Sequence, residues 1–244
     1  MKYLILSITF LFFASCTVKD DTKALQQIKL GNEFMDAKNY SSALPCFKKA
    51  LQYELTPETK SKNYRNLAVV YLYMKEADSA KLYSELGIDC SPKDSYYHLI
   101  NLAEYHLLSD SIELALEIFE KAKKMKPKDV TVYNNLSLIY AGSYGEDFLD
   151  LKKALKNAKM AFEISNNSIN QEQLASVHFQ LESYDKAANL FHDLYERFPA
   201  IKVYSFFEGQ CLYFAGEEEK GYSLMLEAAN RDAESKKLLE EISS

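Results

Sequence analysis

Tryptophan is absent from the 244-residue sequence, and glycine (7 residues) and proline (5 residues) are scarce. With so few turn-forming residues, the chain has little room for the many tight turns that a β-sandwich needs. The formal net charge is −6, with acidic and basic residues interspersed. A nucleic-acid-binding surface would need a net basic face, so we expect no nucleic-acid partner. The hydrophobic content of 48% is ordinary for a folded domain.

Catalytic signatures are missing as well. The sequence contains no G-x-S-x-G, no P-loop and no G-x-G-x-x-G. Its four histidines, His98, His106, His178 and His192, form no H-E-x-x-H motif and pair with no cysteine at metal-ligand spacing. We therefore expect a protein that is not an enzyme and that uses no metal and no cofactor. For His106 and His178 we expect packed core positions.

Residues 1–15 differ in character from the rest of the chain. Lys2 is their only charged side chain, and an apolar run of 11 residues covers positions 3–13 before Ala-Ser-Cys at 14–16. Eleven residues are too few to span a bilayer as a helix. A basic start, a short apolar run and small residues at its end are typical of an export signal.

The Ala-Ser-Cys ending resembles the lipobox of bacterial lipoproteins, although phenylalanine replaces the usual leucine three positions before the cysteine. The resemblance implies that Cys16 is lipidated, that residues 16–23 form a polar tether, and that the protein is attached to a membrane of the bacterial cell envelope. Thr17, where aspartate would retain the protein in the inner membrane, points to the outer membrane on either its periplasmic or its surface face. An ordinary cleaved signal and an uncleaved short anchor are the alternatives.

Three further cysteines, Cys46, Cys90 and Cys211, lie far apart in sequence without a C-x-x-C motif. An odd number in an oxidising compartment leaves at least one thiol unpaired. Because all three fall on expected helices or at a helix end, we interpret them as small buried apolar residues.

Residues 96–129 contain two amphipathic helical patterns with a short polar break between them. Small and apolar residues recur in both at three- and four-residue spacing, which places them on one face of each helix. We expect Asp110 to cap the second helix, with Glu113 as its reciprocal partner, and Pro127 to end it. Two helices this short cannot bury their own apolar faces, so further helices must pack on both sides.

The same pattern occurs six times along the chain. The small residue that begins the second-helix signature lies at positions 43, 80, 115, 154, 187 and 221, in steps of 37, 35, 39, 33 and 34 residues. A period near 34 with this pattern resembles the tetratricopeptide repeat over residues 24–231. The resemblance implies an all-α fold, a right-handed α-solenoid of six helix-turn-helix repeats with a C-terminal capping helix over residues 232–244.

Three repeats depart from the pattern. The second has Ser84 where an aromatic residue is usual. The fourth carries additional residues between its helices, around positions 141–148. The sixth contains Gly209, Gly216 and Gly221 and has Glu208 at a position that is usually apolar. We therefore expect the sixth repeat to be irregular or frayed.

The family resemblance also implies that the first helix of each repeat lines a concave groove, where peptides or partner helices bind. Asn66, Asn101 and Asn135 stand at one shared position of three such helices, and a ladder of amides there could satisfy the backbone of an extended peptide. Asparagine is also common at that position in the repeat, so a structural role stays open. Other expected groove positions are apolar or aromatic, and each could instead pack on a neighbouring repeat. They are Val69, Leu72, Tyr73, Tyr97, Leu107, Leu108, Phe179, Phe206, Tyr213 and Phe214.

The carboxylate clamp of co-chaperone members is not expected. Asn32 and Asn66 match two of its asparagines, but Ile28, Tyr97 and Asn101 occupy the positions that should be basic. The sequence thus predicts a membrane-anchored interaction scaffold of the bacterial cell envelope that binds a peptide or helix of a protein partner in its groove. The alternative is an envelope sensor or capture lipoprotein that binds a small molecule, glycan or peptide there.

Overall fold

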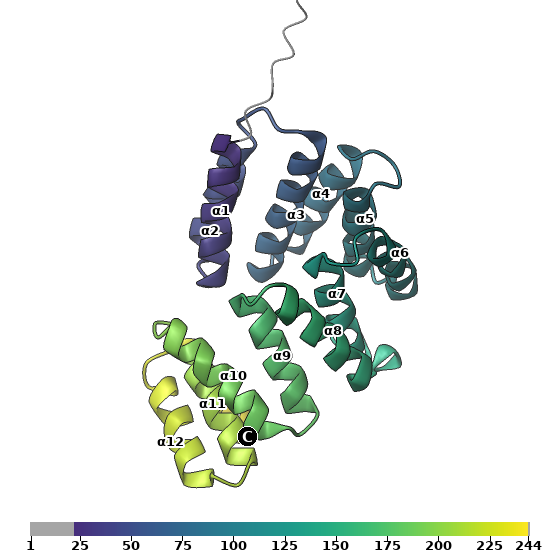
Figure 1. The fold of residues 1–244 in the computed structure, drawn as a ribbon. Helices are drawn as coiled ribbons and strands as arrows, with labels where there is room; N and C mark the ends of the chain where they lie inside the picture. The colour runs from purple at the N-terminus through teal and green to yellow at the C-terminus, as the bar shows by residue number, and fades with distance from the viewer. Residues whose placement is uncertain (1–21, 244) are drawn as a thin grey trace, which may run out of the picture.

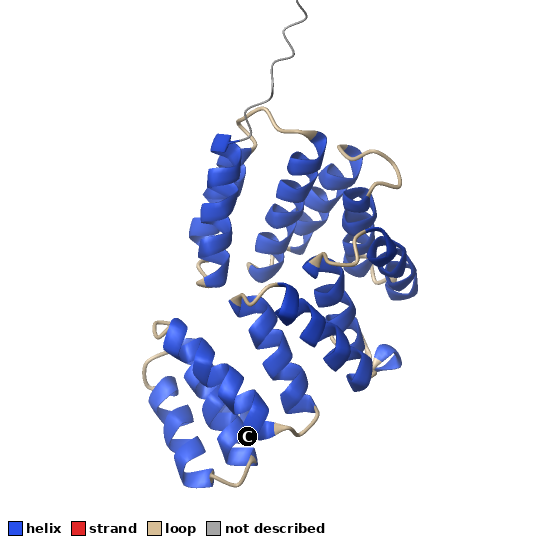
Figure 2. Cartoon of the chain, in the orientation of Figure 1, coloured by secondary structure: helices blue, strands red, loops and turns tan. Residues whose placement is uncertain are grey.

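The computed structural model describes residues 22–243, which form thirteen α-helices and one short 3-10 helix and contain no strand (Figure 2). The expected all-α fold is confirmed. Cys16 and the expected export signal lie outside the described residues. In chain order the helices are α1 (Thr22–Asp36), α2 (Tyr40–Ala50), α3 (Pro57–Tyr73), α4 (Ala77–Asp89), α5 (Tyr96–Leu108), α6 (Ile112–Met125), α7 (Val130–Tyr140), η1 (Glu146–Phe148), α8 (Leu151–Ile164), α9 (Ser168–Gln180), α10 (Tyr184–Arg197), α11 (Lys202–Phe214), α12 (Glu218–Ala229) and α13 (Ala233–Ser243).

Successive helices pair into six hairpins, from α1–α2 to α11–α12, and α13 packs against α11 and α12. Figure 1 shows the hairpins stacked in a curved array, so the chain is a solenoid of helical repeats. Between residues 22 and 243, no helix combines the length and the apolar content that crossing a bilayer requires.

Small residues hold the paired helices close together, as expected. The alanines that begin the second-helix signature are fully buried, and Phe47 and Phe119 fill the space beside them. A Cβ at Gly31 would lie 2.5 Å from a ring carbon of Phe47, so this approach requires glycine. The buried alanines are Ala43, Ala80, Ala115, Ala154 and Ala187.

All six hairpin turns are closed in one way. A residue with positive φ stands in each turn, and the N–H of the next residue donates to a carbonyl five positions earlier, as from Ser111 to His106 (2.9 Å). The prediction that Asp110 caps α6 is wrong. Asp110 is the positive-φ residue of its turn (φ +56°), a conformation that aspartate tolerates, and Ser111 is the N-cap without a side-chain cap bond.

The sixth repeat is regular, so the expectation that it is irregular or frayed is wrong. Gly209 and Gly221 face each other across the α11–α12 contact, and a Cβ on either would lie 2.5–2.6 Å from the other's carbonyl oxygen. Gly216 takes the left-handed position of the turn (φ +97°). Glu208 lies 3.1 Å from Nδ1 of His192. The glycines permit close packing rather than fraying.

The additional residues of the fourth repeat fold back onto the solenoid. The N–H of Asp150 donates to the carbonyl of Tyr140 (2.8 Å), which closes the segment that contains η1. Phe148 and Tyr144 pack against the core that α5, α6 and α7 share. The insertion therefore adds Tyr144 to the inner side of the solenoid.

Curvature brings the first and fifth repeats into contact. The turn between α1 and α2 lies beside the start of α9 (Figure 1). Ile169 of α9 packs against the core formed by α1, α2 and α3. In addition, Ser168 Oγ donates to the carbonyl oxygen of Asp36 (2.8 Å). The first five repeats thus form a ring around the concave side.

Candidate functional site

The ring surrounds a cavity of about 1100 Å³ that is partly open to solvent. Its wall is built mainly by the first helix of each of five repeats, α1, α3, α5, α7 and α9. Pockets for small ligands occupy roughly 300–1,000 Å³. The cavity is therefore large enough for a short polymer segment.

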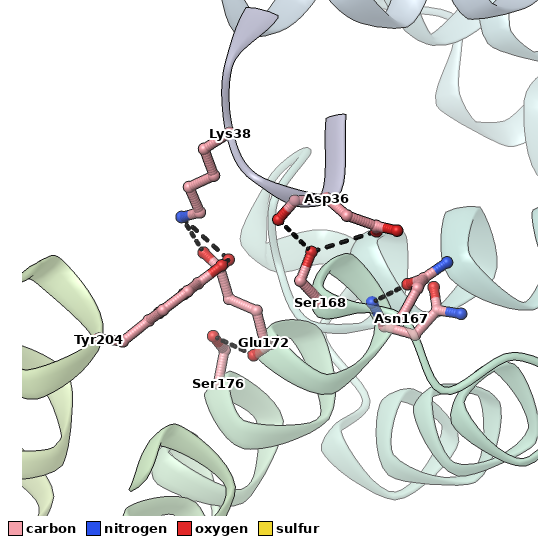
Figure 3. Close-up of polar contacts among 8 residues, drawn as sticks. Asp36, Lys38, Asn167, Ser168, Glu172, Ser176 and Tyr204 are labelled. Carbon is pink, nitrogen blue, oxygen red and sulfur yellow. Dashed lines mark hydrogen bonds and ion pairs between the residues drawn. The ribbon is translucent and has the colours of Figure 1, made fainter. Parts of the chain in front are cut away.

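One edge of the cavity is held by a polar contact that we call the latch, formed by Asp36, Lys38, Ser168, Glu172 and Tyr204 (Figure 3). Lys38 Nζ lies 3.0 Å from Glu172 Oε1 and 2.9 Å from Oε2. It also lies 4.9 Å from the centre of the Tyr204 ring. The Tyr204 hydroxyl donates to Glu172 Oε2 (3.2 Å). The latch thus joins the α1–α2 turn to α9 and α11.

Amides and tyrosine hydroxyls are the main uncharged polar groups of the cavity wall, which also contains many apolar side chains. Tyr40 and Tyr73 stack with ring centroids 4.8 Å apart. Burial raises the pKa of Tyr73 to about 12, with help from the negative charge of Glu172. Its hydroxyl therefore stays neutral and can donate or accept a hydrogen bond at physiological pH. The lining amides are Asn32, Asn66, Asn134, Asn135, Asn167, Asn170, Gln173 and Gln180, and the lining tyrosines are Tyr40, Tyr73, Tyr97 and Tyr144.

An ion pair lies within the wall. Arg65 Nε donates to Glu104 Oε1 (2.8 Å), and the two side chains are 20% and 12% exposed. Asn135 Nδ2 donates to the same oxygen (3.1 Å). Among residues 22–243, nothing bonds the two terminal nitrogens of Arg65 or the second oxygen of Glu104. At this point the wall offers a ligand both donors and an acceptor.

Two buried polar atoms of the lining residues have no hydrogen-bond partner in the described part of the chain. They are Asn66 Nδ2 and Asn134 Oδ1. The amide nitrogen of Asn134 is held by Asn170 Oδ1 (2.7 Å), which fixes the orientation of that side chain. A buried polar group without a partner is costly. Both residues belong to the cavity wall.

Five of the predicted groove residues lie on the cavity wall: Asn66, Tyr73, Tyr97, Leu108 and Asn135. Their role in binding stays a prediction. The wall also includes three of the additional apolar positions, Val69, Leu72 and Leu107.

The prediction that Asn101 faces the groove is wrong, so the three asparagines form no continuous ladder. Its side chain is fully buried, and its Nδ2 donates to Ser61 Oγ (2.9 Å) and to the carbonyl oxygen of Tyr97 (2.8 Å). A Cβ on Gly87 would overlap the Asn101 amide. Because glycine leaves that space empty, the amide fills it and joins the second repeat to the third.

Four aromatic predictions also fail. Phe206 is fully buried and packs with Met225 in the core of the sixth repeat. Phe179 packs on the ring of Phe214 (centroids 5.7 Å apart), Tyr213 and Phe214 are exposed, and none of these three borders the cavity. For the three residues of α11, the physical reason is ring closure between the first and fifth repeats, which leaves this helix outside the cavity wall. Phe179 lies on α9, and its ring packs against Tyr184 and Phe214 instead.

Sequence reasoning missed the charged residues of the site, among them Lys38, Arg65, Glu104 and Glu172. For Arg65 and Glu104 a signal existed, because opposite charges stand on the first helices of adjacent repeats. No sequence signal links Lys38 to Glu172, since 134 positions separate them.

The remaining reactive side chains have structural positions. In the described part of the chain, no group of three or more His, Cys, Asp or Glu side chains is placed to hold a metal ion. Cys46, Cys90 and Cys211 are free, and Cys90 is only partly buried. His178 is a buried core residue, as expected, and burial lowers its pKa; His106 is half-buried.

Comparisons with known proteins concern the fold. No known family profile matches the chain. Mouse BBSome complex member BBS4 is 32% identical over 75 residues, which are 31% of this chain and only 14% of BBS4. A thermophilic TPR protein from Thermus thermophilus aligns over 78% of this chain and 98% of its own, at 17% identity and a TM-score of 0.55.

Two further solved structures share the architecture. A chain of the APC/C hetero-tetramer Cut9–Hcn1 aligns with a TM-score of 0.61 at 13% identity, over 89% of this chain and 42% of its own. PilF from Pseudomonas aeruginosa aligns with a TM-score of 0.50 at 16% identity, over 91% of this chain and 98% of its own. At these identities the likeness shows a common fold.

Proposed function

We propose that this chain, which has the tetratricopeptide-repeat fold, is an interaction scaffold of the bacterial cell envelope that is anchored through a lipid on Cys16 and holds an extended segment of a protein partner in its cavity. The observation that carries the proposal is the chemistry of the cavity wall. The wall combines apolar side chains with amides and tyrosine hydroxyls. An amphipathic partner helix would use only the apolar part of the wall, whereas an extended segment can also bond its backbone to the amides.

An extended peptide presents a donor and an acceptor at nearly every residue. The cavity wall offers both kinds of partner. Asn135 and Gln173 use their amide nitrogens within the protein, Gln173 by donating to the carbonyl oxygen of Asn134 (2.9 Å), so their side-chain oxygens can accept from a ligand. Arg65 and Tyr73 supply donors. Backbone recognition of this kind binds a segment with little dependence on its side chains.

Two similar proteins support a partner of protein type, because both are parts of assemblies. One is the chain of the Cut9–Hcn1 hetero-tetramer and the other is the BBSome complex member BBS4. The second likeness covers only a small part of BBS4, so the hydrogen-bonding groups of the cavity wall are the stronger support.

Site-specific photocrosslinking tests the binding site in intact cells. We would introduce p-benzoylphenylalanine at Tyr73, which lines the cavity, and at Tyr222 on α12, which does not; the two side chains are similarly exposed (45% and 49%). We expect a protein adduct at position 73 and none at 222. Adducts at 222 alone, or at both positions equally, would contradict binding in the cavity.

Membrane attachment is tested separately. Cys16→Ser removes the sulfur that a lipid would modify, so we expect the variant to leave the membrane fraction. Cys90→Ser serves as the control and should stay membrane-bound. Retention of the Cys16→Ser variant in the membrane would rule out the lipid anchor.

The same wall favours a second candidate, capture of a small polar molecule or glycan, because amides also bind sugar hydroxyls. Native mass spectrometry of the purified protein distinguishes the candidates. A retained non-protein ligand that is lost in Arg65→Ala would favour capture. A ligand-free protein that crosslinks to a partner at Tyr73 would favour the scaffold.

A further inference from the structure

We propose that the latch controls access to the cavity: when Lys38 separates from Glu172, the first repeat moves away from the fifth and the cavity opens to a partner segment. The identity of the molecule that enters the cavity rests on the proposed function. The opening motion is inferred from the structure of the ring alone.

The latch differs from the other contacts between repeats. Neighbouring hairpins share buried apolar cores, such as the one in which Phe47 and Leu67 are fully buried. Across the ring closure, Ile169 packs against that core, Lys38 lies on the fully buried ring of Tyr204, and the remaining contacts are polar. The Lys38 and Glu172 side chains are 25% and 28% exposed, so water can reach both. Such a contact opens more readily than a buried core.

The charges of the latch depend on each other. Glu172 accepts from Lys38 Nζ and from the Tyr204 hydroxyl, and the ammonium lies against the face of the Tyr204 ring (Figure 3). Removing Lys38 leaves a carboxylate with one neutral donor. Reversing one charge makes the two sides of the ring repel each other.

The latch lies on the same cavity surface on which the proposed segment would bind. Asp36, Lys38, Ser168 and Glu172 all line the cavity, so a segment bound there lies next to the latch. A cationic group of the segment competes with Lys38 for Glu172, and an anionic group competes with Glu172 for Lys38. Binding and opening are therefore coupled, and each must favour the other to the same extent.

The turn of the second repeat provides a matched control. Lys75 has the same residue type and the same left-handed backbone as Lys38 (φ +62° and +52°), and it is exposed. No described residue forms an ion pair with it. Lys75→Glu therefore changes the net charge by the same amount as Lys38→Glu without affecting the latch.

Access is measured on the full chain with Leu107→Cys as reporter, because Leu107 lines the cavity and is buried, at 7% exposure. The rate of its modification by a polyethylene-glycol maleimide is compared with that by N-ethylmaleimide, and mass spectrometry of the peptide containing residue 107 separates it from the native cysteines. We expect Lys38→Glu and Glu172→Lys each to raise the bulky reagent's relative rate about tenfold, the effect of losing one charge-assisted contact. The double reversal should restore the slow rate, and Lys75→Glu should leave it unchanged.

Circular dichroism checks that each variant is folded, and Glu172→Gln provides a milder change if a reversal is not. Any of three results would contradict the proposal that the latch controls access: an equal effect of Lys75→Glu, no rescue in the double variant, or an unchanged rate in every folded variant. Because the measurement needs no partner, absence of crosslinking at position 73 would contradict the proposed function and leave this result intact.

Discussion

Replacing Gly221 with alanine should destabilise the sixth repeat by about 1–2 kcal/mol. The new Cβ would lie 2.5 Å from the carbonyl oxygen of Gly209, 2.5 Å from the backbone nitrogen of Tyr213 and 2.8 Å from its Cα. All three are backbone atoms of α11, so no side-chain rotation can relieve the overlap. The two helices must move apart.

The magnitude follows from two opposing effects. Overpacking of a close helix contact costs typically 1–3 kcal/mol, and the upper part of this range, about 2–3 kcal/mol, applies here because the overlap is with backbone atoms. Alanine regains roughly 1 kcal/mol of helix propensity relative to glycine, which offsets part of this cost. Gly209→Ala should destabilise the sixth repeat to a similar extent, because its Cβ would lie 2.6 Å from the carbonyl oxygen of Gly221. Since either change separates the same two helices, the double variant should cost less than the sum of the single ones.

Denaturant unfolding and amide hydrogen exchange together measure the effect. Exchange should accelerate in α11, α12 and α13 and stay unchanged in α1–α4, because repeats contact mainly their neighbours. Ser223→Ala, at an exposed position of α12, is the control and should be neutral or slightly stabilising. A Gly221→Ala variant as stable as Ser223→Ala would refute the close contact between α11 and α12.

Three further predictions concern side chains of the first five repeats and α11. Arg65→Ala should cost roughly 2–3 kcal/mol in denaturant unfolding, because it leaves Glu104 unpaired; the cost stays below that of a fully buried pair because both side chains keep some exposure. Burial lowers the pKa of His178 in the folded protein below its unfolded value of about 6.5. The neutral side chain therefore contributes to stability above pH ~6.5, and this contribution is lost as the pH falls toward the folded-state pKa. His178→Gln should therefore flatten the pH dependence of unfolding just below pH ~6.5. Burial raises the pKa of Cys211 to about 12, so iodoacetamide should modify Cys90 well before Cys211 in the folded protein and without preference in denaturant.

The fold could be predicted because its determinants are local. Helical periodicity and a small residue at a fixed place recur with each repeat, and Ala43, Ala115 and Ala187 are buried where that pattern requires. The sixth repeat was wrongly predicted to be irregular, because glycine can either weaken a helix or permit two helices to pack closely. A sequence alone does not tell glycine that weakens a helix from glycine that permits close contact, and Gly209 and Gly221 belong to the second kind.

The cavity could be predicted only in part. Asn66 and Asn135 lie on it, whereas Asn101 at the same repeat position does not, because Gly87 on α4 leaves room for its amide to turn inward. The orientation of a side chain thus depends on a residue in another helix. Ring closure depends on small rotations of each repeat relative to the next, which add up over five repeats, so it cannot be predicted from the sequence pattern of one repeat.

Residues that break the repeat pattern therefore carry the most information about ligand choice. Counting from the shared asparagine position, the counterparts of Arg65 are Ile100, which is fully buried, and Asn134. The counterparts of Glu104 are Val69 and Leu138, both apolar. Packing of the solenoid alone does not require a charge at either place, since the other repeats pack without one. The Arg65–Glu104 pair, with free donors and a free acceptor toward the cavity, is better explained by what the cavity holds than by the stability of the stack.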